Sequence, residues 1–163
     1  MMWRRGSFLI LLVAAALIGG CEDKKAKCDK LALSIRGAAK KEMPVAGDLP
    51  DPKATPGETD ISRALRRSSA AISREYDDWM LKRPDKMTSP KGATSIKQYS
   101  EALLAMEIKD EALKGHVKTY SDAVKAVWEQ SKERVDADAK AKEEAAIAAV
   151  EATHASIVGW CTQ

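Results

Sequence analysis

The chain has 163 residues, of which 27 are Lys or Arg and 24 are Asp or Glu. Arg4 and Arg5 are two of the 27, so the chain beyond residue 20 carries 25 basic and 24 acidic side chains. A nearly neutral chain lacks the excess positive charge that binds polyanions, so we expect no nucleic-acid partner. The 143 residues after residue 20 are enough for one domain with a real core.

The chain begins with a short basic and apolar leader. Two arginines precede an apolar stretch over 8–18, and two small glycines then precede Cys21. A membrane-spanning helix needs about 20 apolar residues, so this stretch is too short and is typical of a signal peptide. The segment Ile18-Gly19-Gly20-Cys21 resembles a lipobox, the cleavage site of bacterial lipoproteins. The alternative is an ordinary signal peptide cut near Gly20, which leaves Cys21 as a thiol.

The resemblance implies that residues 1–20 are removed and that Cys21 becomes an acylated first residue. A diacylglycerol on its sulfur, usually with a further acyl chain such as palmitate on its amine, would hold the protein durably on a bilayer. We therefore expect a lipid-anchored protein of the bacterial cell envelope, exposed to the periplasm. Aspartate directly after the cysteine is the better-known signal for retention at the inner membrane. This chain has Glu22 there, so we favour the outer membrane.

Two further cysteines lie near the ends of the chain beyond the leader, Cys28 and Cys161. Because an exported protein meets oxidising conditions, an even pair predicts one disulfide. Two free thiols or a metal-binding pair are the alternatives. These interpretations divide the chain into a signal peptide (1–20), a tether to the lipid (21–27) and one helical domain (28–163).

The six prolines mark two predicted loops, roughly 44–55 and 83–94, with Pro56 at the start of the helix after the first loop. Proline is excluded from helix interiors, so the rest of the chain forms three helical tracts. None of the tracts alternates β-branched residues, so we predict no sheet. The first tract, 23–43, has apolar residues at helical spacing, including Leu31 and Ile35.

Capping motifs predict where the later helices begin. Thr55-Pro56-Gly57-Glu58 reads as a capping box that opens a helix ending near Lys82. A second box begins at Ser95 and opens a short helix to about Met106. After a break at 108–110, Asp110 can cap the next helix.

The last tract is too long for one helix of a small domain. We place a turn at 135–139, where charged residues and aspartates interrupt the apolar stripe, and a final helix up to Cys161. Gly115 is a competing break point, and one long helix to Trp160 is the other alternative.

The predicted fold is all-α: an up-down-up-down four-helix bundle with one short extra helix. This order puts the start of the first helix and the end of the fourth at the same pole. Cys28 and Cys161 are the residues found there, so the disulfide should close the bundle between its first and last helices.

His154 shares the apolar stripe of the last helix, and a metal site there would have Cys28 as the only obvious further ligand. We interpret His154 as a core histidine, His116 as a surface residue or helix start, and predict no metal site. Haem held by Met43 or Met80 together with His154 is the alternative. The chain has no Cys-x-x-Cys-His for covalent haem.

The sequence contains no Gly-rich phosphate loop, nucleophile elbow or His-Glu-x-x-His motif, so we expect no enzyme and no cofactor. Trp79 and Trp128 either fill the core or serve as exposed contacts for a partner. The expected function is a non-enzymatic binding or structural module that holds an envelope protein or polymer near the membrane. The alternative is a small-ligand or haem-binding bundle with a redox or sensing role.

Overall fold

The computed structural model describes residues 19–50, 52–83, 89–133 and 136–163, with side chains from residue 24 onward. In these ranges all regular secondary structure is helical, which confirms the predicted all-α class. The elements are α1 (Gly19–Glu42), α2 (Val45–Asp48), α3 (Asp60–Lys82), α4 (Thr94–Leu104), α5 (Glu111–Ser131) and α6 (Ala139–Thr162). The predicted signal peptide lies outside the described residues except for its last two positions.

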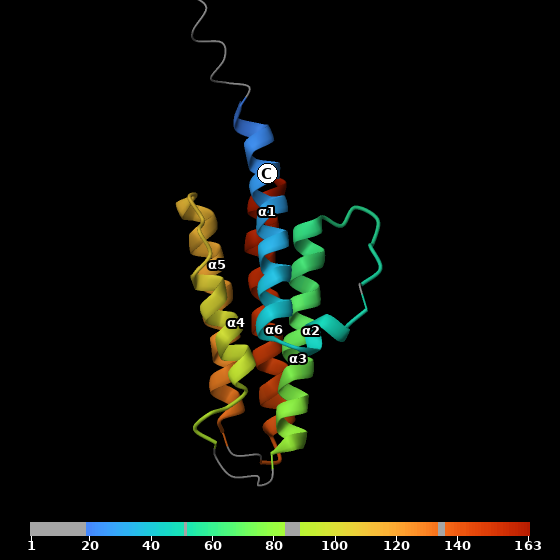
Figure 1. Cartoon of the computed structure of the whole chain (residues 1–163), viewed down its shortest axis with the longest axis vertical. Coiled ribbons are helices and arrows are strands. Elements are labelled where there is room, and N and C mark those ends of the chain that lie inside the picture. Colours follow the sequence, from blue (N-terminus) through green and yellow to red (C-terminus); the bar gives the residue numbers. More distant parts are fainter. Residues whose placement is uncertain (1–18, 51, 84–88, 134–135) are drawn as a thin grey trace, which may run out of the picture.

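The long helices α1, α3, α5 and α6 lie side by side with their axes roughly aligned (Figure 1). In the described part of the chain, α3 packs against α1 and α6, and α5 packs against α4 and α6. The shorter α4 also contacts α1, while the single turn α2 lies against α3. Each long helix therefore has at least two neighbours against which it buries an apolar face.

The predicted up-down-up-down order is not confirmed, because α1 and α3 run in the same direction (Figure 1). Arg36 of α1 donates a hydrogen bond to the carbonyl oxygen of Asp60 at the start of α3 (3.4 Å), and Arg67, further along α3, donates to the carbonyl oxygen of Ala46 (3.1 Å). The reason is the length of the connection over 49–59. Eleven residues can span at most roughly 36 Å, which leaves enough length, even with the turn at 55–58, to return the chain toward the pole where α1 begins.

The remaining connections do reverse the chain. Ser121 of α5 donates to the carbonyl oxygen of Ser100 in α4 at 2.7 Å, and Trp128, later in α5, donates to the carbonyl oxygen of Lys91 before α4 at 2.9 Å. This pairing makes α4 and α5 antiparallel. Since α6 returns along α5, its end lies beside the first half of α1 (Figure 1).

The predicted start of α3 is wrong by several residues. The amide of Thr55 does donate to the Glu58 carboxylate at 3.1 Å, but these residues form an isolated turn. Gly57 has φ = 80°, a left-handed conformation that an α-helix cannot contain. The helix begins instead at Asp60, with Thr59 as the N-cap that accepts a hydrogen bond from the Ser62 amide (3.3 Å).

Of the other two predicted helix starts, one is wrong and one is confirmed. Ser95 lies inside α4 and donates to the Glu75 carboxylate (2.9 Å), so it does not cap the helix. Asp110 caps α5 as predicted, because its carboxylate accepts a hydrogen bond from the Leu113 amide at 3.0 Å. The helix continues through Gly115 without a break.

The last tract is two helices, as predicted, with α5 ending at Ser131 and α6 beginning at Ala139. The turn begins a few residues earlier than expected. Part of it, residues 134 and 135, lies outside the description.

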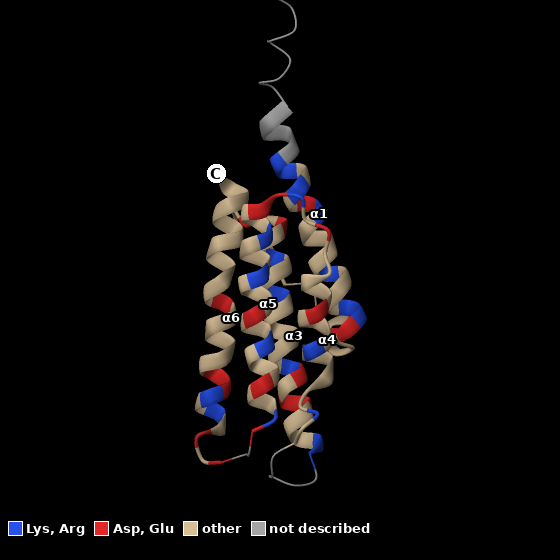
Figure 2. Cartoon of the chain, turned by 90° about the vertical axis from the view of Figure 1, so that its left-hand side faces the viewer, with Lys and Arg blue, Asp and Glu red and all other residues tan. Residues whose placement is uncertain are grey.

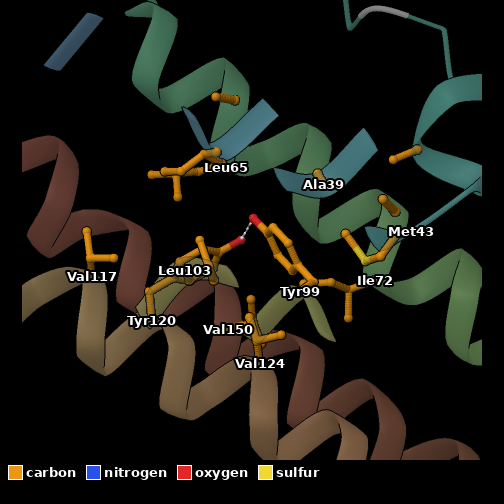
Figure 3. Packing of buried hydrophobic residues seen from close by; sticks show 14 of the residues in the cluster. Ala39, Met43, Leu65, Ile72, Tyr99, Leu103, Val117, Tyr120, Val124 and Val150 are labelled. Carbon is orange, nitrogen blue, oxygen red and sulfur yellow. Dashed lines mark hydrogen bonds between the residues drawn. The ribbon is translucent and has the colours of Figure 1, made fainter. Parts of the chain in front are cut away.

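The core is a single cluster to which all six helices contribute. Two tyrosines on neighbouring helices, Tyr99 of α4 and Tyr120 of α5, lie at its centre with their hydroxyl groups directed toward each other (Figure 3). Serines fill positions where helices approach closely, and each is almost fully buried: Ser68, Ser69, Ser100, Ser121 and Ser131. Lys and Arg positions alternate with Asp and Glu positions along the helices (Figure 2).

Candidate functional site

One pole of the molecule carries the disulfide between Cys28 of α1 and Cys161 of α6, whose Cα atoms are 5.9 Å apart. Both cysteines face a neighbouring helix, and Cys28 is only 5% exposed. The predicted pairing is therefore confirmed. Next to it, the Lys24 ammonium lies 4.6 Å from the centre of the Trp160 ring, a cation–π contact that joins the same two helices.

Cys21, the predicted lipidation site, belongs to α1, two turns before Cys28. Its side chain lies outside the described residues, so the lipid anchor stays a prediction. Because α1 is continuous over this stretch, Cys21 lies about 10 Å along the helix axis from the disulfide. An acyl chain on Cys21 would thus emerge at the pole that the disulfide closes.

His154 of α6 is half-buried and directed toward α3 and α5. Its Nε2 atom lies 3.2 Å from the Ser69 hydroxyl, and its ring packs edge-on against Tyr120 with the ring centres 5.6 Å apart. Burial without an acidic partner lowers the pKa of His154 to about 4. The predicted core role of His154 agrees with these contacts.

The lowered pKa of His154 makes the stability of the protein depend on pH. Between pH 6.5 and about 4 the unfolded chain binds a proton at this residue and the folded chain does not, so stability falls as the pH falls through this window. Between pH 6.5 and about 4, we expect the free energy of unfolding to fall by about 1–2 kcal/mol more for wild type than for His154→Gln, after allowance for partial solvent screening. Urea unfolding at several pH values measures this, and parallel curves for the two proteins would contradict it.

The methionines proposed as haem ligands occupy different surroundings. Met43 is fully buried beside Ile72 and Tyr99 (Figure 3), and Met80 is half-buried near the Arg83 guanidinium. A haem iron bound to Met43 and His154 would have to displace the core packing of the first and the serine contact of the second. His116 is half-buried on α5, close to the start of that helix.

Trp79 and Trp128 are both half-buried near the opposite pole. The Trp79 indole donates to the carbonyl oxygen of Ser131 at 3.1 Å, and the Trp128 indole donates to the carbonyl oxygen of Lys91 at 2.9 Å. The Lys132 ammonium lies 4.1 Å from the centre of the Trp128 ring. Their polar atoms therefore tie loops and helix ends together, as expected of packing residues.

Gly92 is part of the same packing. With φ = 57°, it brings the backbone so close to α5 that a Cβ atom would lie 2.6 Å from the Ser131 hydroxyl and 2.9 Å from the Trp128 indole nitrogen. Ser131 uses its hydroxyl to accept a hydrogen bond from the Ala93 amide at 2.7 Å. These contacts make the pole near Trp128 a structural junction between the backbone before α4 and the end of α5.

A groove of about 680 Å³ opens beside the disulfide pole, between α1 and the connection from α4 to α5. Its apolar lining comes from Leu31 of α1, Met106 and Ile108 of the connection, and Leu113 of α5. Lys30 and Lys109 lie at the groove with exposed side chains. The volume falls within the roughly 300–1,000 Å³ typical of small-ligand sites.

Sequence reasoning did not identify this groove. It recognised 108–110 as a break between helices, but it could not show which surface packs opposite that break. The only available signal was that Met106 and Ile108, two large apolar residues, lie in a connecting segment.

No group of three or more metal-ligating side chains occurs among the residues whose side chains are described. Within the same part of the chain, no helix combines the length and the hydrophobicity that crossing a bilayer requires. No protein-family model matches the sequence, and comparison with curated proteins and with solved structures likewise finds no match.

Proposed function

We propose that the protein is a lipoprotein of the bacterial envelope, anchored through acyl chains on Cys21, with a helical domain that acts as a non-enzymatic binding or structural module. The observation that carries the proposal is the Cys28–Cys161 disulfide, which joins the last helix to the first helix two turns after the lipobox. A disulfide suits an exported protein, as the lipobox also requires.

The disulfide also supports a mechanical role for the pole. A lipid on Cys21 pulls on α1, and the bond to α6 passes that load to the helix at the other end of the sequence. The domain would be held close to the bilayer as one body, with the junction near Trp128 directed away from the membrane. This arrangement would present an envelope protein or polymer with the distal surface of the bundle, and we place the protein at the outer membrane.

Metabolic labelling with palmitate tests the anchor. We expect Cys21→Ser to abolish incorporation of the label and to move the protein from the membrane fraction to the soluble envelope fraction, because the thioether to the diacylglycerol cannot form. The double variant Cys28→Ala/Cys161→Ala is the matched control and should retain both the label and the membrane fraction. Label that persists in Cys21→Ser would contradict the proposal.

A further inference from the structure

The groove beside the disulfide pole combines an apolar floor with a cationic edge. Leu31, Ile108 and Leu113 supply aliphatic surface, and Met106 adds a flexible thioether side chain that adapts to the shape of a ligand. Leu31 and Leu113 are almost fully buried, so they form the floor, whereas Met106 and Ile108 are half-buried and line the opening. Such a surface fits a slender hydrocarbon chain.

The charged side chains at the groove differ in whether they already have a partner. In the part of the chain that the structure describes, neither Lys30 nor Lys109 forms an ion pair. Of the two acidic residues at the groove, Asp110 already accepts the capping hydrogen bond from the Leu113 amide, and the other is the exposed Glu107. With Lys27 also in the lining, three lysines face two carboxylates, so the groove has a small excess of positive charge. Two exposed ammonium groups beside an apolar floor complement a ligand with a hydrocarbon chain and an anionic head.

The groove also lies close to the proposed membrane attachment. Ala26, the first lining residue, is five residues after Cys21 on the continuous helix α1, or about 8 Å along its axis. With acyl chains on Cys21, the opening would lie at the depth of the lipid headgroups, where polar contacts to lysine side chains form readily.

We propose that this groove binds one acyl chain of an anionic phospholipid of the host membrane, with Lys30 and Lys109 contacting its phosphate. The inference rests on the proposed lipid anchor for its source of ligand. It gives the module a ligand class, and bound lipid would fix the rotation of the bundle about α1 relative to the membrane surface.

Photocrosslinking in vesicles tests the proposal. The acylated protein is reconstituted into phosphatidylglycerol vesicles that contain a phosphatidylglycerol with a diazirine in one acyl chain. We expect label in peptides covering 26–34 and 105–113, and at least a fivefold loss from both in Ile108→Glu, which puts a charge at the opening. Leu81→Glu is the matched control, because Leu81 is 84% exposed at the C-terminal end of α3, far from the groove. This variant should be labelled to the same extent as wild type.

A separate experiment tests whether binding depends on the two lysines and on an anionic headgroup. Lys30→Glu/Lys109→Glu should lower the label in the groove peptides at least threefold. Replacement of both the vesicle lipid and the diazirine probe by phosphatidylcholine should lower it to a similar degree. Lys125→Glu, on the exposed face of α5, should change nothing. Equal labelling in phosphatidylcholine, or equal labelling of Ile108→Glu and wild type, would overturn the proposal.

Two readouts separate this proposal from the lipid anchor. Label on a peptide covering 155–163 but absent from the groove peptides overturns the groove and leaves the anchor intact. Conversely, native mass spectrometry of Cys21→Ser with lysophosphatidylglycerol should show a one-to-one complex that Ile108→Glu abolishes. That complex would support lipid binding in the groove even if the palmitate experiment contradicted the lipid anchor. Its absence from Cys21→Ser would overturn the proposal that the groove binds lipid.

Discussion

Replacement of Cys28 and Cys161 by alanine should lower the free energy of unfolding by about 3 kcal/mol, with about 5 kcal/mol as the upper bound. The two cysteines are 133 positions apart, so the bond restricts nearly the whole unfolded domain. Loss of that restriction raises the chain entropy of the unfolded state, and the folded state also loses the covalent link between α1 and α6. A change of this size is a large share of the roughly 5–15 kcal/mol typical of a domain.

Urea unfolding with and without a reductant measures the effect of the disulfide. Reduction should destabilise the wild-type protein by a similar amount and should leave Cys28→Ala/Cys161→Ala unchanged, since that variant has no bond to reduce. Alanine is the appropriate replacement because Cys28 is buried, where a serine hydroxyl would add a desolvation cost. Equal unfolding midpoints for oxidised and reduced wild type would show that the bond does not stabilise the fold.

Truncation of the central tyrosine, Tyr99→Ala, should lower the free energy of unfolding by about 3–5 kcal/mol. Tyr99 is fully buried, and its ring packs edge-on against Tyr120 with the ring centres 6.4 Å apart. Removal of the ring leaves a cavity that the surrounding helices cannot fill without moving. Burial raises the pKa of Tyr99 to about 12, and its hydroxyl lies 3.2 Å from that of Tyr120.

The hydroxyl groups of this pair can be tested separately from the rings. Tyr99→Phe and Tyr120→Phe should each lower the free energy of unfolding by about 1 kcal/mol. Each removes the 3.2 Å hydrogen bond between the two hydroxyl groups, while the Ser68 hydroxyl still contacts the one that remains. The double variant should cost less than the sum of the two. Tyr76→Phe is the matched control: this buried hydroxyl has no hydrogen-bond partner among the described residues, so its removal should not destabilise the protein. Additive losses in the double variant would contradict the coupling.

Predictions that depend on neighbouring residues give the number and approximate limits of the long helices, but only one of the three predicted helix starts is correct. The capping role of Asp110 needs only the carboxylate and the amide three residues later, and the structure has that bond. The division between α5 and α6 follows from a charged stretch that cannot bury an apolar face. The failure at Thr55 is equally local, because Gly57 allows a left-handed turn that separates the capping motif from the helix after it.

Predictions that depend on the path of the chain agree less well. The shared pole of Cys28 and Cys161 was inferred from an up-down-up-down order, yet the structure reaches the same pole with α1 and α3 parallel. Connections in helical bundles commonly have 2–8 residues, which favours antiparallel neighbours. The longer segment over 49–59 permits the return.

The sequence by itself determined the helical class, the approximate limits of most helices and the cysteine pair. These features depend on hydrogen bonds and apolar spacing within a few residues, or on the chemistry of one residue type. Only the tertiary structure decided that α1 and α3 run parallel, that Tyr99 meets Tyr120, and that the α4–α5 connection faces α1 across a groove. Those features join residues that are distant in sequence, and which distant surfaces meet is set by the burial of apolar area over the whole chain, which no local pattern records.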